Sequence, residues 1–373
     1  MRFPELRADD RQMRWAFALF LTVPIATAVV VALSGEWIPV GDDGLLLLRA
    51  DDVGSSHHPL LGSWTSVSKT VGEDINNPGA WYSYLIAAPV AVLGPITGGA
   101  IAVALLNSLA VLAIVWAAGE WGGSRAAIGM GAAAAGLCWA MGSELLIDVW
   151  QPHALLLPAT LFMVLAVGVG DGRSRFVPWL LAVGSVIVQT HLGYVYLIGL
   201  TSILALALGG VRRRTTLRQG PLAVLRTRTA LLSGLALLAA WLPALVDLAR
   251  DGSDSNLARL LRSLGEGEST LGLVGGVRVA GQVLVAPWSR LRFANAVTPA
   301  GVPNALEIPG LLPWAIASLV LTVTVVALFL LRRATESRGV RTALEVAIGV
   351  VPITVIALSL LPLGQLVGAH QVR

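Results

Sequence analysis

Long apolar runs recur along the whole chain and restrict it to one class of fold. Several of them approach the ~20 residues that a helix needs to cross the hydrocarbon core of a bilayer. The chain is 55% hydrophobic and only 13% charged, and its mean hydropathy is +0.76. Because unpaired backbone N–H and C=O groups are costly in lipid, such runs are expected to be helical. The sequence therefore predicts an all-α, polytopic transmembrane helical bundle of about nine or ten helices.

These apolar segments follow one another without an internal repeat, a low-complexity tract or a soluble domain between them. We therefore expect one membrane domain that covers residues 1–373. The segments run approximately over residues 15–35, 81–95, 97–119, 126–147, 154–170, 176–190, 192–209, 229–248, 310–331 and 342–363.

Arginine clusters orient these segments, because short loops rich in Lys and Arg stay on the cytoplasmic side. The loops near 212–228 and 332–341 are such clusters, and four arginines precede the first segment. Counting from these markers places several polar stretches together outside the cytoplasmic membrane. They are a first extracytoplasmic loop at 36–80, Trp150–His153, Gln189–His191 and a second large loop at 249–309.

The count contains one conflict. Three apolar segments separate the first loop from Trp150, yet both must lie on the same side. Either 81–95 is a short helix that does not cross, or Pro95 merely interrupts one longer excursion. The sequence leaves both alternatives open.

Charge and cysteine content exclude other classes. The formal net charge is +4, but the arginines stand beside apolar segments, so the topology rule explains them and we expect no nucleic-acid partner. Among 26 basic residues only Lys69 is a lysine, a bias typical of GC-rich bacterial genomes such as those of actinobacteria. The lone Cys138 can form neither a disulfide framework nor a cysteine metal site.

A polar island at residues 41–62 follows the first apolar segment. It begins with Asp42 and Asp43, and Asp51 and Asp52 follow nine residues later. A carboxylate at the membrane surface can act as a general base, although a lone acidic residue more often just solvates a loop. The stretch between the two pairs is predicted to be an interfacial helix with acids at both ends. Arg49 is placed either to pair with Asp52 or to hold a phosphate.

Further polar residues interrupt the apolar sequence on the same predicted side. His57 and His58 precede Pro59, and their adjacency favours hydrogen bonding or loop structure over zinc binding. Glu144 and Asp148 are four residues apart, which predicts one helical face behind Trp150 and His153. His191 is equally compatible with a structural role and a functional one. The other residues of interest are Asn77, Pro78, Gly79 and Gln189.

Taken in order, these motifs resemble a known family. The GD with a following Arg, the DV pair, SxHxPLxG, a Pro–Gly turn before aromatics, WxPH and QTHxGY are similar to a bacterial family of membrane-embedded GT-C glycosyltransferases. That family lies near the protein mannosyltransferase and lipid A aminoarabinose transferase type. The resemblance covers residues 36–262. Family members continue further, which implies that this chain lacks their C-terminal portion.

The resemblance implies a function and a site. The expected donor is a polyprenyl-phosphate sugar, and the acceptor hydroxyl belongs to a glycan, a lipid or a protein. Asp42 matches the position of the catalytic base, with Asp43 as the alternative, and inversion at the anomeric carbon would follow. We expect no cofactor and no metal. The residues expected to contact donor or acceptor are Arg49, Asp52, His58, Asn77, His153, Gln189 and His191, although Asn77 stands where relatives carry His.

Two other classes of protein fit the composition. A transporter or flippase of lipid-linked envelope precursors would place ionisable groups near the membrane midplane on repeated halves. The charges here gather at one face, which favours an enzyme. A non-catalytic membrane partner in envelope assembly could instead use the loop at 249–309 as a docking surface.

Overall fold

Helices make up the fold throughout the part of the chain that a computed structural model describes. The described residues are 8–35, 37–65, 67–68, 72–217, 228–263, 270–284 and 311–361. They contain no sheet, only an isolated antiparallel bridge between Trp64 and Asn76. Six of the described helical stretches are long and apolar enough to cross a membrane. The described residues thus form an all-α, multi-pass membrane protein, as predicted, although they contain six candidate spanning helices where about nine or ten were expected.

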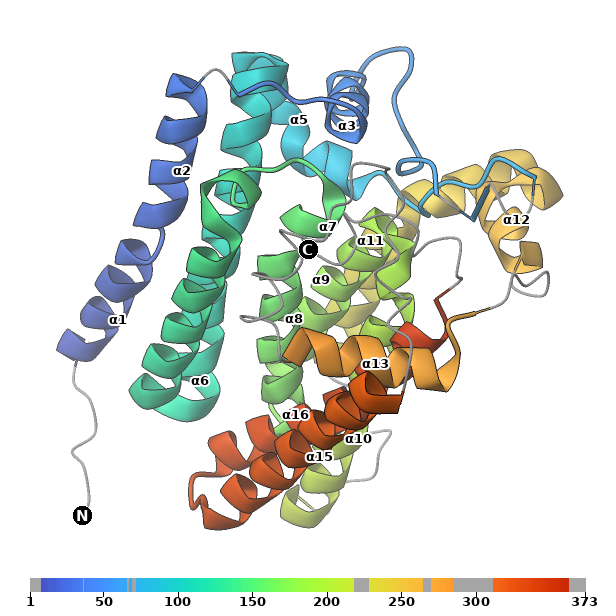
Figure 1. The fold of residues 1–373 in the computed structure, drawn as a ribbon. Coiled ribbons are helices and arrows are strands. Elements are labelled where there is room, and N and C mark those ends of the chain that lie inside the picture. The colour runs from blue at the N-terminus through green and yellow to red at the C-terminus, as the bar shows by residue number, and fades with distance from the viewer. Residues whose placement is uncertain are drawn as a thin grey trace.

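The helices follow the predicted apolar segments closely and are arranged as an upright bundle (Figure 1). They are α1 (Ala8–Phe20), α2 (Val23–Ser34), α3 (Asp42–Asp51), α5 (Trp81–Leu93), α6 (Pro95–Leu145), α7 (Gln151–Ala154), α8 (Leu156–Gly170), α9 (Val177–Thr190), α10 (Val195–Leu217), α11 (Arg228–Asp251), α12 (Asn256–Ser263), α13 (Gly272–Leu284), α15 (Leu311–Ala334) and α16 (Arg338–Ser359).

Apolar side chains cover the outside of this bundle as well as its inside. Leu19, Val30 and Trp139 are 58%, 67% and 86% exposed. A water-soluble monomer seldom exposes so many large apolar residues, whereas lipid solvates them without cost. The exposed apolar surface therefore agrees with the helix lengths in indicating a bilayer.

Helix α6 doubles back on itself and resolves the conflict in the sequence count. Gly123 interrupts it with φ 69° and ψ −168°, a conformation that essentially only glycine adopts. The two legs lie side by side (Figure 1), and the Asn107 Nδ2 of the first leg donates at 3.0 Å to the carbonyl of Leu146, the residue that follows the second leg. The second leg of α6 therefore ends at the same end of the bundle as the one at which α6 begins.

Helix α5 is a separate, short element that lies at that same end. Its 13 residues span about 20 Å, less than the hydrocarbon core. Gly94, at φ 79°, and Pro95 divide it from α6. The structure thus agrees with the first of the two alternatives, in which the segment at 81–95 does not cross the membrane.

Close contact with α6 holds α5 in place and yields a stability prediction. A Cβ on Gly98 would lie 2.3 Å from the Pro89 carbonyl oxygen, so Gly98→Ala must push the two backbones apart. We expect it to lower the free energy of unfolding by about 1–3 kcal/mol, measured by chemical unfolding in mixed micelles. Gly136→Ala, with no neighbouring atom within 4 Å, is the matched control, and equal losses in both variants would contradict the prediction.

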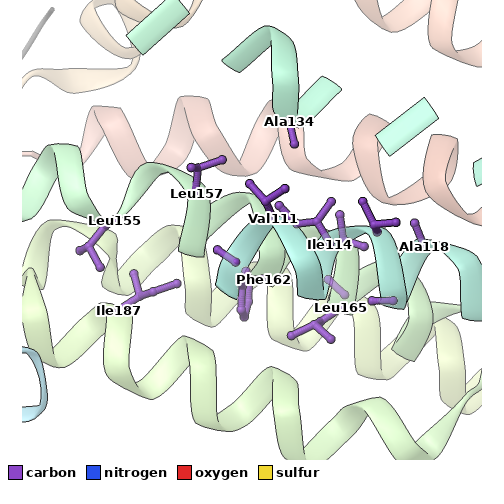
Figure 2. Close-up of a cluster of buried hydrophobic side chains, with 14 of the residues drawn as sticks. Val111, Ile114, Ala118, Ala134, Leu155, Leu157, Phe162, Leu165 and Ile187 are labelled. Atoms are coloured by element: carbon purple, nitrogen blue, oxygen red, sulfur yellow. The ribbon is translucent and has the colours of Figure 1, made fainter. Parts of the chain in front are cut away.

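The hydrophobic core lies between α6, α8 and α9 (Figure 2). Phe162 from the middle of α8 is fully buried and sits among Ile114 of α6 and Ile187 of α9. Small residues such as Ala118 and Ala134 let the two legs of α6 approach each other. Such close packing of small residues is the usual means of helix association in lipid, where no hydrophobic force drives it.

The two ends of the bundle carry opposite kinds of side chains. At the arginine end, which we define by Arg173, Arg212 and Arg338, these cations surround the buried Asp171 between α8, α10 and α16. At the acidic end, defined by α3, the turn at 148–153 and the α9–α10 corner at 190–194, lie the polar stretches that the sequence analysis placed together. Helix α3 lies at the top of Figure 1, and α10 and α16 reach its bottom.

The stretch predicted as a second large loop, 249–309, contains helices. At the acidic end, α12 is held by Asn256, whose side chain accepts from the Asn76 N–H at 2.7 Å and donates to the Asn76 carbonyl at 2.9 Å. The apolar helix α13 instead packs against α15 and α16 through Ala280, Leu321 and Val355. Residues 264–269 and 285–309 of this predicted loop lie outside the described residues.

Candidate functional site

Helix α3 contributes the charged residues Asp42, Asp43 and Arg49 to the candidate site. Its first turn carries Asp42 and Asp43 and its last turn Arg49, the charge order that the helix dipole favours. Leu46, Leu47 and Ala50 are buried against α5 and the upper part of α6. The predicted helix between the two acidic pairs is therefore confirmed, and its apolar face determines which acid points inward.

Asp43 points inward and Asp42 does not. Asp43 is partly buried, whereas Asp42 is exposed. The Asp43 carboxyl lies beside that of Asp148, which belongs to the turn between α6 and α7, and the two are close enough to share a proton in a hydrogen bond. We call Asp43, Asp148 and His153 the acid cluster.

Two further donors fix the Asp148 carboxylate. The backbone N–H of Trp150 donates to Asp148 Oδ1 at 3.0 Å, and His153 Nδ1 is hydrogen-bonded to Oδ2. The Trp150 ring lies edge-on to His153, with centroids 4.7 Å apart. The other ring nitrogen of His153, Nε2, is buried and makes no hydrogen bond within the described residues.

The expectation that Glu144 and Asp148 share a helical face is wrong. Gly142, at φ 71°, breaks the helical geometry and α6 ends at Leu145. Asp148 therefore belongs to the turn that precedes α7, while Glu144 is exposed. The spacing suggested a helix because the glycine break was not recognised.

The surroundings of Asp43 make its carboxyl an unusually weak acid. Partial burial and the neighbouring Asp148 carboxylate raise the pKa of Asp43 from its ordinary value of 3.8 to about 7. Asp42 adds to this rise, and the positive charge of His153 opposes it. A carboxyl with a pKa close to neutrality is suited to accept and release protons at physiological pH.

The raised pKa of Asp43 predicts a pH-dependent cost to stability. Between about pH 4 and pH 7 the folded carboxyl retains a proton that the unfolded one has lost, so the free energy of unfolding falls as pH rises through this window. Asp43→Asn removes that cost. We expect the variant to melt at a higher temperature than the wild type at pH 8 but not at pH 4. Asp51→Asn, an exposed carboxyl on the same helix, should show no such difference, and equal melting shifts at both pH values would refute the assignment.

Arg49 and Asp52 lie at the other end of α3. The Arg49 Nη2 donates to the Leu61 carbonyl at 3.0 Å, and its Nε is buried without a hydrogen-bond partner among the described residues. Burial lowers the pKa of Arg49, and the charge of Asp52 partly offsets this effect. Arg49 thus holds the first loop to α3 and retains a free donor.

His58 serves local structure. Its Nδ1 accepts the Gly54 N–H at 3.0 Å, and its ring stacks on Tyr84 with centroids 5.2 Å apart. The Tyr84 hydroxyl in turn donates to the Pro59 carbonyl at 2.6 Å. These contacts place His58 in the loop–α5 junction rather than in the acid cluster.

Asn77, Gln189 and His191 form a second group, which we call the corner group because it surrounds the α9–α10 corner. Asn77 accepts the Leu192 N–H at 2.9 Å and donates to the Ser63 carbonyl at 3.1 Å. Gln189 Nε2 donates to the Ala240 carbonyl of α11 at 2.9 Å. His191 accepts the Gly193 N–H at 3.2 Å. The hydrogen bonds of this group join the first loop to α9, α10 and α11.

Ser63 and Gln151 connect the corner group to the acid cluster, and neither was singled out from the sequence. The Gln151 Nε2 donates to Ser63 Oγ at 2.9 Å, and Ser63 Oγ also accepts from Asn77 Nδ2 at 3.2 Å. Gln151 lies two residues before His153 on the same turn of α7. A polar residue inside the WxPH motif was the available signal for it.

At the acidic end, the structure thus brings Asp43, Asp148 and His153 together in the acid cluster. In the parts of the chain with a described structure, no group of three or more His, Cys, Asp or Glu side chains is placed to hold a metal ion. Comparison with protein-family models, curated proteins and solved structures finds no match to this chain.

Proposed function

We propose that this chain is a membrane-embedded glycosyltransferase of GT-C type, which transfers a sugar from a polyprenyl phosphate to an acceptor hydroxyl with Asp43 as general base. The observation that carries the proposal is the inward-facing Asp43 carboxyl beside the oriented Asp148 and His153 at one end of a bundle of apolar helices. The pKa of Asp43, raised to about 7, supports the same role. The motif resemblance points to the same helix but to Asp42. Asp42 is exposed to solvent whereas Asp43 faces the protein interior, which favours Asp43 as the base.

The reaction needs one proton acceptor and a place for the leaving phosphate. Asp43 would take the proton of the acceptor hydroxyl as its oxygen attacks the anomeric carbon. The bond from that carbon to the phosphate oxygen would break, its electron pair would stay on the phosphate, and the configuration would invert. The partly buried Arg49, with its free Nε donor, would stabilise the phosphate as negative charge builds on it.

The position of the acid cluster argues against a transporter of lipid-linked precursors. Transporters place ionisable groups near the midplane, where helices break. Here Asp43, Asp148 and His153 lie on a surface helix and in a turn between helices. A lipid-anchored donor would present its sugar phosphate near such an end of the bundle.

A transfer assay with native membranes tests the proposal. Membranes that contain the chain are supplied with a panel of radiolabelled polyprenyl-phosphate sugars, mannose and arabinose included. We expect at least one donor to be consumed, with label entering a membrane acceptor, and no consumption in membranes without the chain. If no donor is consumed although the protein is intact and shows a cooperative thermal transition, the glycosyltransferase proposal fails in favour of a non-catalytic partner.

A further inference from the structure

The Asp148 carboxylate is oriented by contacts that do not involve Asp43. The Trp150 N–H occupies Oδ1 and the His153 Nδ1 occupies Oδ2. Both donors come from the five residues that follow Asp148, so the turn and the first residues of α7 hold the carboxylate rigidly. The Asp148 side chain is 19% exposed and that of His153 13%, which limits competition from water.

This rigid carboxylate faces the proposed base. Resting on the proposed function, we propose that Asp148, oriented by His153, is a positioning residue that accepts a hydrogen bond from Asp43 once Asp43 has taken the acceptor proton. The acceptor O–H bond breaks and its proton forms an O–H bond on Asp43. The acceptor oxygen bonds to the anomeric carbon, while the bond from that carbon to the phosphate oxygen breaks and its electron pair leaves with the phosphate. Asp148 neither gains nor loses a proton in this step.

Asp148 and His153 have opposite effects on the protonation of Asp43. Asp42 on its own helix, Asp148 and His153 from the turn, and Tyr82 from α5 are the titratable groups that face it. The negative charge of Asp148 favours protonated Asp43, whereas the positive charge of His153 disfavours it. Removing Asp148 should therefore make Asp43 a stronger acid and a weaker base, and removing His153 should do the reverse.

The pH dependence of transfer tests this inference. In the wild type the ionised Asp43 is the active form, so the rate should rise with pH through about 7. In Asp148→Asn we expect this rise to move down by at least one pH unit and the plateau rate to fall roughly tenfold, because a weaker base is less effective. In His153→Gln the rise should move to higher pH. A merely structural role would lower the rate without these opposed shifts.

Two control variants separate charge from folding. Asp148→Glu retains the carboxylate and should keep the rise in rate close to that of the wild type. Glu144→Gln removes an exposed carboxyl from the end of α6 and should change neither the profile nor the plateau. An unchanged profile in both Asp148→Asn and His153→Gln would overturn the positioning role.

An infrared titration of the purified, substrate-free chain in lipid nanodiscs gives a readout without turnover. We expect a protonated-carboxyl band that disappears near pH 7, is absent in Asp43→Asn, and moves to lower pH in Asp148→Asn. If this behaviour is found and no donor is ever consumed, the carboxyl pair stands and the glycosyltransferase proposal fails. If transfer depends on Asp43 but the infrared band disappears at the same pH in Asp148→Asn as in the wild type, the proposed role of Asp148 fails and the proposed function stands.

Discussion

Asp43→Asn is expected to lower glycosyl transfer by about 10²–10⁴-fold, the usual contribution of a general base. Asparagine keeps the size of the side chain and its hydrogen bond to Asp148, but it cannot accept the acceptor proton. The loss should appear in the turnover rate more than in the KM for donor, because Asp43 acts on the acceptor. Initial rates over a range of donor concentrations in reconstituted membranes measure both quantities.

The control for this variant is Asp51→Asn at the opposite end of α3. Asp51 is exposed. Because exposed substitutions usually change the free energy of unfolding by no more than about 0.5 kcal/mol, we expect Asp51→Asn to fold normally and to keep its transfer rate within about twofold of the wild type. Loss of transfer in Asp42→Asn but not in Asp43→Asn would move the base back to the residue that the motif resemblance indicates. Equal losses in Asp43→Asn and Asp51→Asn would point to a general effect of α3 on folding.

Asp171→Ala is expected to have the largest effect on stability, about 3 kcal/mol of unfolding free energy. The Asp171 side chain is 5% exposed and accepts from Arg173 Nε at 3.1 Å and Arg338 Nε at 3.0 Å. Removing one partner of a buried ion pair costs about 3–5 kcal/mol. We place the value at the lower end because Arg173 and Arg338 are 38% and 59% exposed and can turn towards water.

A second ion pair at the arginine end provides the comparison. Glu120 pairs with Arg175, and both side chains reach solvent, so Glu120→Ala should cost less than about 1 kcal/mol. Chemical unfolding in mixed micelles measures both variants. A similar cost for the two would mean that burial of Asp171 adds nothing to its ion pairs.

The helix that carries the acidic residues was predicted from the sequence, but which of Asp42 and Asp43 faces the protein was not. Consecutive residues on a helix point about 100° apart, so Asp42 and Asp43 cannot both face the protein. Asp43 shares the i, i+3, i+4, i+7 stripe with Leu46, Leu47 and Ala50. That stripe was a usable signal in the sequence, but the motif resemblance led to Asp42 instead.

Three of the residues that were expected to contact the donor or the acceptor have structural partners. His58, Asn77 and Gln189 were expected to contact donor or acceptor because they lie in the motifs that carry the family resemblance. In the structure His58 and Asn77 use their polar atoms on backbone or loop partners, and Gln189 donates to a backbone carbonyl. Such hydrogen bonds join segments that are distant in sequence, so no local pattern announces them.

The sequence by itself determined that the chain forms apolar membrane helices and that residues 42–51 form the helix α3, because hydropathy and helical period are local properties of the chain. Only the tertiary structure decided that α5 stays at one end, that α6 reverses at Gly123, and that Asp43 meets Asp148 and His153. The last of these contacts depends on how α3 docks on α5 and α6 through its buried leucines. Packing between distant segments selects one such docking among many that the same local pattern allows.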